Sequence, residues 1–275
     1  MPTRCTQASR SNTFTIFGAN GFVGSNLSKF LEEQGCIVNR VPRDGVICDN
    51  PGHIIYCIGM TADFRNRPFD TVEAHVSKLK KVVEQNSFNS LTYLSSTRLY
   101  NAGSSKESEP LTVSPEKIDD LYNISKICGE NLTLNHGYNV PSRVIRLSNV
   151  VGPNEGQRDT FLGQIIRASR TGVLKLQDHI QYEKDYIYIN DVVRFIYEVV
   201  TRDLHGIFNC SSGKNISHNT WITELEKFYE FELIQNDEAQ LRKSINIYNS
   251  RTDYKLKNFV NPLSKITQII NGENI

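Results

Sequence analysis

One short segment near the start of the chain restricts the fold most: a strand, a glycine-rich turn and a helix in direct succession. Residues Thr13–Phe17 (TFTIF) are β-branched and aromatic, as in a buried strand. A glycine turn follows, and Ser25–Gln34 then has apolar residues at helical spacing up to Gly35. Such a unit points free backbone N–H groups and the helix dipole at a pyrophosphate. The predicted cofactor contacts in the turn are Gly18, Gly21, Phe22, Val23 and Gly24.

Composition excludes several classes of function. The chain has 275 residues and a net charge of +1, so nothing draws the whole molecule to nucleic acid or to an anionic membrane. No apolar run is long enough to span a membrane, and residues 1–12 lack an apolar signal-peptide core. None of the six cysteines has metal-type or redox-type spacing. We therefore expect a cytoplasmic protein with reduced cysteines, no metal, and a short disordered tail at 1–12.

The segment after the second predicted strand, Cys36–Val41, bears on the choice of dinucleotide. An acidic residue at the strand tip binds the ribose hydroxyls of NAD, whereas an arginine pairs with the 2′-phosphate of NADP. This chain has both types side by side, because Arg43 precedes Asp44. Arg40 adds further positive charge. We expect NADP on the strength of Arg43, with NAD as the alternative.

Further strand patterns at His53–Ile58 and Leu91–Ser95 alternate with helical ones, which predicts an α/β fold with a doubly wound parallel sheet of the Rossmann type. The stretch from Gly45 to Pro51 is short, so the usual third strand and its helix should be missing or much reduced. We place a dinucleotide-binding lobe at 13–150 and a smaller substrate-binding lobe at 151–275, interleaved in one unit.

Three residues form a candidate catalytic group. Ser96 leaves the carboxyl end of a predicted strand, where open α/β sheets bind ligands. Tyr122 and Lys126 are four residues apart in a predicted helix at Ile118–Asn135, so they lie on one face. A free tyrosine ionises near pH ~10, and a neighbouring ammonium would lower that pKa. Ser96 could donate a hydrogen bond to an oxygen that develops charge.

The order of the glycine turn, Ser96 and the Tyr122/Lys126 pair resembles the extended short-chain dehydrogenase/reductases, in their epimerase/dehydratase branch. Residues 144–153 (VIRLSNVVGP) look like the family segment R-x-x-N-V-Y-G-P, with Val151 in place of tyrosine. Residues 208–217 (FNCSSGKNIS) match F-N-x-x-x-G-x-x-x-S. The resemblance covers nearly all of the chain after residue 12.

This resemblance implies further contacts. On the cofactor side these are Ile58, Gly59, Leu147 and Ser148, together with Tyr122 and Lys126. On the side of a nucleotide-diphosphate sugar they are Ser96, Thr97, Tyr122, Asn149, Lys184 and Arg251. Lys184 stands where the family usually has arginine, and Arg251 is equally compatible with a solvated surface cation. His75 stands where the family helix commonly has asparagine.

Two positions narrow the reaction. Dehydratases of this branch carry Asp and Glu directly after the catalytic hydroxyl, where this chain has Thr97 and Arg98. Reductases that first epimerise beside the ketone carry cysteine at the second position. The remaining reactions are reduction of a 4-keto group on a nucleotide-linked 6-deoxysugar, as in surface-polysaccharide synthesis, and 4-epimerisation with NAD. A non-catalytic cofactor-binding protein is a third alternative. Relatives often form dimers, so a homodimer is expected by resemblance alone.

Overall fold

The computed structural model describes residues 12–42, 45, 50–60, 63–100, 105–251, 253–254 and 258–272. Residues 1–11 of the tail expected at 1–12, and Arg43 and Asp44 at the end of the second strand, lie outside these residues.

A parallel six-stranded sheet forms the centre of the molecule. Its strands are β1 (Thr13–Phe17), β2 (Ile37–Val41), β3 (His53–Tyr56), β4 (Ser90–Ser96), β5 (Ser142–Leu147) and β9 (Gly206–Cys210). Their order is β2-β1-β3-β4-β5-β9, and every neighbouring pair is parallel. The predicted doubly wound α/β fold is confirmed. Within the described part of the chain β2 is an edge strand, consistent with the missing third strand.

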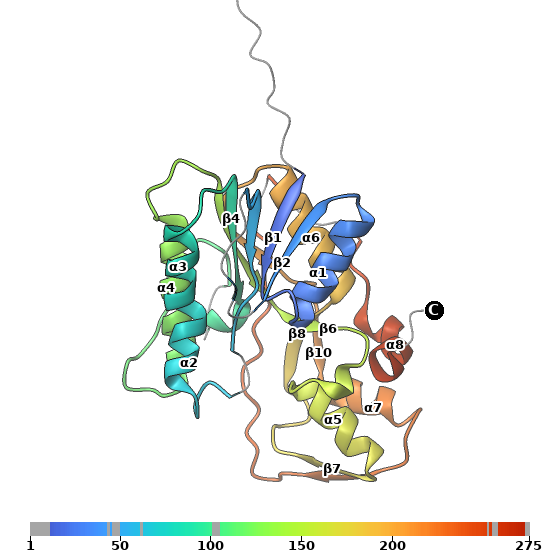
Figure 1. Ribbon diagram of the computed structural model, residues 1–275. Coiled ribbons are helices and arrows are strands. Elements are labelled where there is room, and N and C mark those ends of the chain that lie inside the picture. The colour runs from blue at the N-terminus through green and yellow to red at the C-terminus, as the bar shows by residue number, and fades with distance from the viewer. Residues whose placement is uncertain are drawn as a thin grey trace, which may run out of the picture.

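Helices cover both faces of this sheet. On one face lie α1 (Phe22–Glu33) and α6 (Ile189–Thr201), which pack on each other. On the other lie α2 (Pro68–Val72), a π-helical turn (Glu73–Ser77), α3 (Lys78–Glu84) and α4 (Asp120–Leu134), as Figure 1 shows.

Two carboxylates lie at the start of α4, Asp119 at the N-cap and Asp120 in the first turn, but neither bonds to the first free N–H groups of the helix. Asp119 pairs with Arg65 instead. Asp120 accepts hydrogen bonds from the Ser114 backbone N–H and from Asn123. Both carboxylates are thus used to fix the loops around the helix start.

A smaller lobe lies beyond the carboxyl ends of the central strands (Figure 1). It contains a sheet of β6 (Asn149–Val151), β8 (Glu183–Tyr188) and β10 (Asn215–Ser217), and a second sheet of β7 (Val173–Leu176) and β11 (Glu232–Gln235). Its helices are α5 (Phe161–Arg170), α7 (His218–Leu225) and α8 (Ile266–Asn271).

The two lobes share one core and one sheet. A single cluster of buried apolar side chains joins Ile16 and Ile145 of the central sheet to Leu174 and Trp221 of the smaller lobe. In addition, α6 and β9 come from the second half of the chain but complete the first lobe. The expected division near residue 150 therefore separates sequence segments that are interleaved in space.

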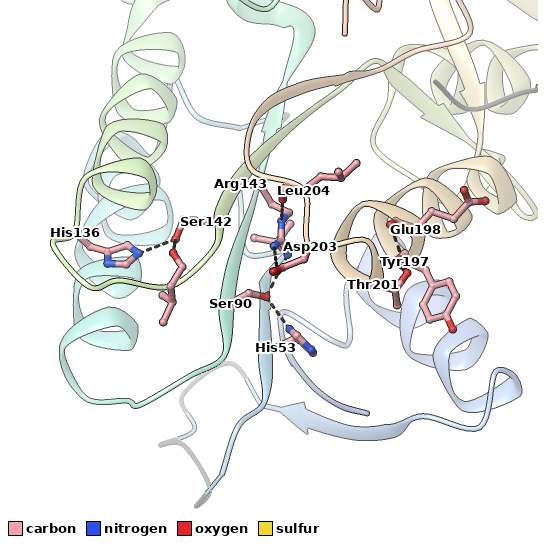
Figure 2. A network of polar contacts seen from close by, with 12 residues as sticks. His53, Ser90, His136, Ser142, Arg143, Tyr197, Glu198, Thr201, Asp203 and Leu204 are labelled. Atoms are coloured by element: carbon pink, nitrogen blue, oxygen red, sulfur yellow. Dashed lines mark hydrogen bonds and ion pairs between the residues drawn. The ribbon is translucent and has the colours of Figure 1, made fainter. Parts of the chain in front are cut away.

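The amino ends of the strands are tied together by a buried arginine (Figure 2). Arg143 on β5 is fully buried and donates to the Leu204 carbonyl at 2.5 Å and to the hydroxyls of Ser90 and Thr92 at 3.2 and 3.3 Å. Its Nη2 lies 3.6 Å from the Asp203 carboxylate. Ser90 is also bonded to His53 Nδ1 at 2.8 Å, so the network spans β3, β4 and β5.

Candidate active site

The glycine turn has the geometry of an anion cradle. Gly18 has a φ of +83°, which favours glycine, and its carbonyl accepts from the Gly21 N–H at 3.0 Å. A side chain at Gly24 would overlap the Gly18 carbonyl oxygen, so the turn packs on helix α1 only because that position is glycine. No side chain of the described residues caps the start of α1 and no acidic residue lies in its first turn. Apart from the Gly21 N–H, which is bonded to Gly18, the N–H groups at the start of α1 therefore remain available to a phosphate.

Phe22 and Val23 form the first turn of α1, beside these N–H groups. The ring of Phe22 is covered by the guanidinium of Arg158, 3.6 Å from the ring centroid, and a side chain at Gly152 would collide with the same ring. Arg158 is held in turn by Glu155 at 2.5 Å. Residues from the smaller lobe thus close over the turn, and sequence reasoning had not identified them.

The adenosine end is only partly described. Arg43, on which the NADP expectation depends, lies outside the described residues. Arg40 was expected to add positive charge there. Instead its guanidinium makes a bidentate pair with Glu32 of α1, with N–O distances of 2.9 to 3.2 Å. Its charge is compensated, so Arg40 no longer supports NADP.

Ser96, Tyr122 and Lys126 meet at the carboxyl edge of the sheet, as the sequence predicted. Ser96 ends β4, and its hydroxyl is hydrogen-bonded to Tyr122. Tyr122 and Lys126 are 5% and 4% exposed, so neither is a surface residue. Lys126 donates to the carbonyl of Leu94 on β4 at 2.9 Å. Helix α4 therefore presents both side chains to the end of the same strand.

Lys126 also reaches the loop after β3. A methyl group built on Gly59 would lie 3.4 Å from its Nζ, which places the predicted cofactor contacts Ile58 and Gly59 beside the ammonium. Burial lowers the pKa of Lys126 to about 7, and the nearby carboxylate of Glu130 opposes that shift. A buried ammonium beside an exposed glycine backbone is well placed to donate to a ribose hydroxyl.

The pKa of Tyr122 departs from the sequence-based expectation. We expected Lys126 to lower it, but burial raises the pKa of Tyr122 above its ordinary value. Two neighbours oppose that shift: the hydrogen bond from Ser96 and the positive charge of Arg98. Lys126, with its pKa of about 7, loses its own proton before Tyr122 does. In the protein without ligands its charge therefore does not favour the phenolate.

His75 occupies the centre of this region and is completely buried. Its Nε2 accepts from the Met60 N–H at 3.1 Å, so Nδ1 carries the hydrogen that it shares with the Ser125 hydroxyl at 2.8 Å. Burial and the charge of Lys126 lower the pKa of His75 to about 2, so the ring is neutral. His75 therefore replaces the usual asparagine with a bridge from the loop after β3 to helix α4.

A buried ion pair supports the lysine and was not predicted. Arg146 of β5 binds both oxygens of Glu130, at 2.9 and 2.7 Å, and donates to the Tyr100 hydroxyl at 2.8 Å. Glu130 lies one helical turn after Lys126, a spacing that could have identified it. Arg146 could not have been paired with it, because their contact depends on how α4 lies over β5.

Four other predicted site residues lie at the ends of central strands or at the start of β6. Leu147 and Ser148 lie at the end of β5, and Thr97 follows Ser96, so all three belong to the carboxyl edge. Asn149 begins β6 and already donates to the Asp185 carbonyl at 2.8 Å.

Lys184 faces this edge from β8 in the smaller lobe. Its Nζ lies 4.7 Å from the centroid of Phe161. Burial lowers the pKa of Lys184, Asp178 opposes this shift, and the positive charges of Arg242 and Arg98 lower the pKa further. Lys184 and Arg98 are therefore close enough to repel each other. Arg242, paired with Asp178, adds a third positive charge near Lys184.

Arg251 is not brought to this group. It donates to the carbonyls of His205 and Ile207, at the amino end of β9, and pairs with Asp253. Its guanidinium is stacked 4.2 Å from the centroid of Phe208. This position is on the opposite edge of the sheet from Tyr122, so Arg251 has a local structural role here.

The described residues contain no group of three or more His, Cys, Asp or Glu side chains arranged to hold a metal ion. Across the same part of the chain, no helix has the length and apolar character needed to cross a membrane.

Solved structures with the same fold carry related ligands. One is MoeE5 in complex with UDP-glucose and NAD, with a TM-score of 0.75, 17% identity, and coverage of 94% of this chain and 97% of that one. RMD from Pseudomonas aeruginosa, complexed with NADPH, has a TM-score of 0.75 and 19% identity, with coverage of 94% of this chain and 97% of that one. UDP-glucose 4-epimerase from Thermotoga maritima, with UDP-glucose, has a TM-score of 0.76 and 16% identity, with coverage of 94% and 97%.

Sequence comparison identifies the family directly. None of the curated proteins compared with this chain matches it in sequence. In contrast, residues 14–211, which are more than half of the chain, match the NAD dependent epimerase/dehydratase family. This span includes the glycine turn, Ser96, Tyr122 and Lys126. The chain therefore belongs to the NAD dependent epimerase/dehydratase family.

Proposed function

We propose that this protein transfers hydride between a nicotinamide dinucleotide and C4 of a nucleotide-linked sugar, and that its net reaction is reduction of a 4-keto group. The convergence of Ser96, Tyr122 and Lys126 at the carboxyl edge, with Thr97 and Arg98 in place of an acid–base carboxylate pair, is the observation that carries this proposal. Elimination of water needs such a pair, whereas ketone reduction needs one proton donor.

The described residues fit a dinucleotide. The open N–H groups of the Gly18–Gly24 turn would hold the pyrophosphate, and Gly59 with Lys126 would hold the nicotinamide ribose. Leu147 and Ser148 would lie near the nicotinamide amide. When bound, the reduced dinucleotide supplies the hydride; all proton chemistry falls to the protein.

Tyr122 gives its phenolic proton to the ketone oxygen. Its raised pKa keeps that proton in place at neutral pH until negative charge develops on the substrate. Ser96, already bonded to Tyr122, donates to the same oxygen. Lys184 would supply positive charge for the diphosphate from the smaller lobe, and Thr97, after β4, and Asn149, at the start of β6, would add polar contacts to the sugar nucleotide. Arg251 has no part in this proposal.

A 4-epimerase with tightly held NAD is the second candidate. The pairing of Arg40 with Glu32 favours it, because one of the two cations that supported NADP is neutralised. An epimerase could use the same three catalytic residues. The two candidates differ in whether the dinucleotide is exchanged in each turnover.

The deciding experiment measures NADPH and NADH oxidation against a panel of nucleotide-linked 4-keto sugars. We expect oxidation with at least one sugar, and a fall of about 10²- to 10⁴-fold in kcat for Tyr122→Phe. Dinucleotide affinity of that variant should be unchanged. Oxidation with no sugar, together with interconversion of reduced sugars and stoichiometric NAD in the purified protein, would replace the reductase by the epimerase.

A further inference from the structure

Tyr122 is the group whose proton must move, so the charges around it decide its pKa. Burial raises that pKa, and any nearby permanent cation lowers it. The residues that pack around the phenol come from several elements. They are Ser96 and Tyr93 on β4, Arg98 after β4, His75 in the π-helical turn and Phe64 before α2. Lys126 lies one helical turn further along α4, the helix that carries Tyr122.

Most of these neighbours carry no charge at neutral pH. His75 is neutral, with a pKa of about 2, and the pKa of Tyr93 is held far above its ordinary value by burial. Lys126 has a pKa of about 7, so it is only partly charged at neutral pH, and it directs its Nζ to the carbonyl of Leu94. The carboxylate of Glu130, behind Lys126, is neutralised by Arg146. Among the described neighbours, Arg98 is the cation that stays fully charged at neutral pH.

Arg98 is held directly against the catalytic ring. Its guanidinium lies 5.2 Å from the centroid of Tyr122 and 4.7 Å from the centroid of Phe64. Its backbone N–H donates to the Ser96 hydroxyl oxygen at 3.1 Å, which fixes the start of its side chain beside the catalytic serine. Among the described residues this guanidinium makes no hydrogen bond or ion pair of its own.

The nearest carboxylates are occupied elsewhere. Asp119 pairs with Arg65, and Asp120 accepts hydrogen bonds from the Ser114 N–H and from Asn123. Burial is the largest influence on the pKa of Arg98 and lowers it, whereas Asp119 and Asp120 have smaller, opposing effects. Because an arginine guanidinium is protonated far above neutral pH, Arg98 remains charged throughout the working pH range. An unpaired permanent cation against a phenol stabilises the phenolate relative to the phenol.

We propose that Arg98, rather than Lys126 alone, is the positioning residue that sets the proton affinity of Tyr122. This inference rests on the proposed function, because it concerns the proton that Tyr122 delivers. It also explains why this chain can have arginine at a place where dehydratases carry an acid. A carboxylate there would stabilise the neutral phenol, whereas a guanidinium favours its ionisation.

The test compares pH profiles of ketone reduction for wild type, Arg98→Met and Arg98→Lys. Reduction requires the protonated phenol, so the rate falls as pH rises through the pKa of Tyr122. Loss of the guanidinium should move that alkaline limb upward by about one pH unit, given its distance and partial exposure to water. Arg98→Lys should recover part of the shift. Arg65→Met is the matched control, because Arg65 contacts the same Phe64 ring from 4.6 Å but is paired with Asp119; its profile should not move.

A second readout does not depend on turnover. In protein labelled with ¹³C at the tyrosine Cζ, the resonance missing from Tyr122→Phe identifies Tyr122. Its titration midpoint should be lower in wild type than in Arg98→Met. Identical midpoints, or an Arg98→Met variant that changes only KM for the sugar, would overturn the inference. If every form is inactive but the midpoints differ, the proposed function fails and the inference about Arg98 stands.

Discussion

Arg143 at the amino edge of the central sheet and Lys126 at its carboxyl edge are buried cations with very different sets of partners. At the amino edge, Arg143 has hydrogen bonds to a carbonyl and two hydroxyls and an ion pair with Asp203 (Figure 2). At the carboxyl edge, Lys126 has one carbonyl acceptor and a depressed pKa.

Hydroxyl groups show the same contrast. Ser90 and Thr92 at the amino edge both accept from Arg143. The hydroxyls of Ser95 and Ser211, buried at the carboxyl edge, have no hydrogen-bond partner among the described residues. Polar groups that satisfy one another stabilise a fold, whereas those left partly unsatisfied mark a place that a ligand completes. We infer from this difference that the amino edge of the sheet mainly stabilises the fold, whereas the carboxyl edge keeps polar groups available to a ligand.

The largest effect on stability should come from Arg143→Met. It leaves the partly buried Leu204 carbonyl and the buried Thr92 hydroxyl without a donor, so the free energy of unfolding should fall by about 3 kcal/mol. Urea unfolding measures this, and kcat per folded molecule should be unchanged. Arg202→Met, which removes an exposed pair with Glu198, should cost under about 1 kcal/mol. A loss of kcat in the Arg143 variant would contradict the proposed separation of the two edges.

Lys126→Met should change the free energy of unfolding in the opposite direction, because it removes a buried charge that destabilises the fold. Its pKa is about 7 in the folded protein and 10.5 in the unfolded chain, so between these values the unfolded chain binds more protons. Stability contributed by this site therefore rises as pH increases from about 7 towards 10.5, and the buried charge is most costly below that range. At about pH 6 the variant should be more stable than wild type by about 2 kcal/mol, although it is inactive.

The pH dependence provides the control for that prediction. The advantage of Lys126→Met should disappear only once the pH exceeds the unfolded-chain pKa of 10.5, because above it the wild-type lysine is neutral in both states. Lys175→Met, at an exposed position of β7, should give a difference that does not vary with pH. Wild type and Lys126→Met with equal stability at about pH 6 would show that the lysine is not destabilising.

The smallest effect is expected for His75→Asn. Asparagine is shorter than the imidazole and should not reach both Met60 and Ser125, so one hydrogen bond is lost and the free energy of unfolding should fall by about 1 kcal/mol. KM for the dinucleotide should rise because Met60 lies beside Gly59. A double-mutant cycle with Ser125→Ala measures the coupling; additive effects would mean that the His75–Ser125 bond contributes nothing.

The sequence determined the parallel α/β fold, the reduced edge beside β2, and the meeting of Ser96, Tyr122 and Lys126. These follow from local rules, since strand and helix periodicity, a glycine turn, and a four-residue spacing on a helix can all be recognised along the chain. The bounds of β1, Thr13–Phe17, were predicted to the residue, while α4 begins at Asp120 rather than Ile118.

Only the tertiary structure decided which charges face one another. Arg40 pairs with Glu32, and Arg251 lies at the amino end of β9. Glu130 of α4 pairs with Arg146 of β5, and the guanidinium of Arg98 packs against the ring of Tyr122. Long charged side chains choose among several partners within reach, and the choice depends on burial and on neighbours distant in sequence. The sequence therefore predicted which side chains carry the chemistry, but not which cation lies against the phenol of Tyr122.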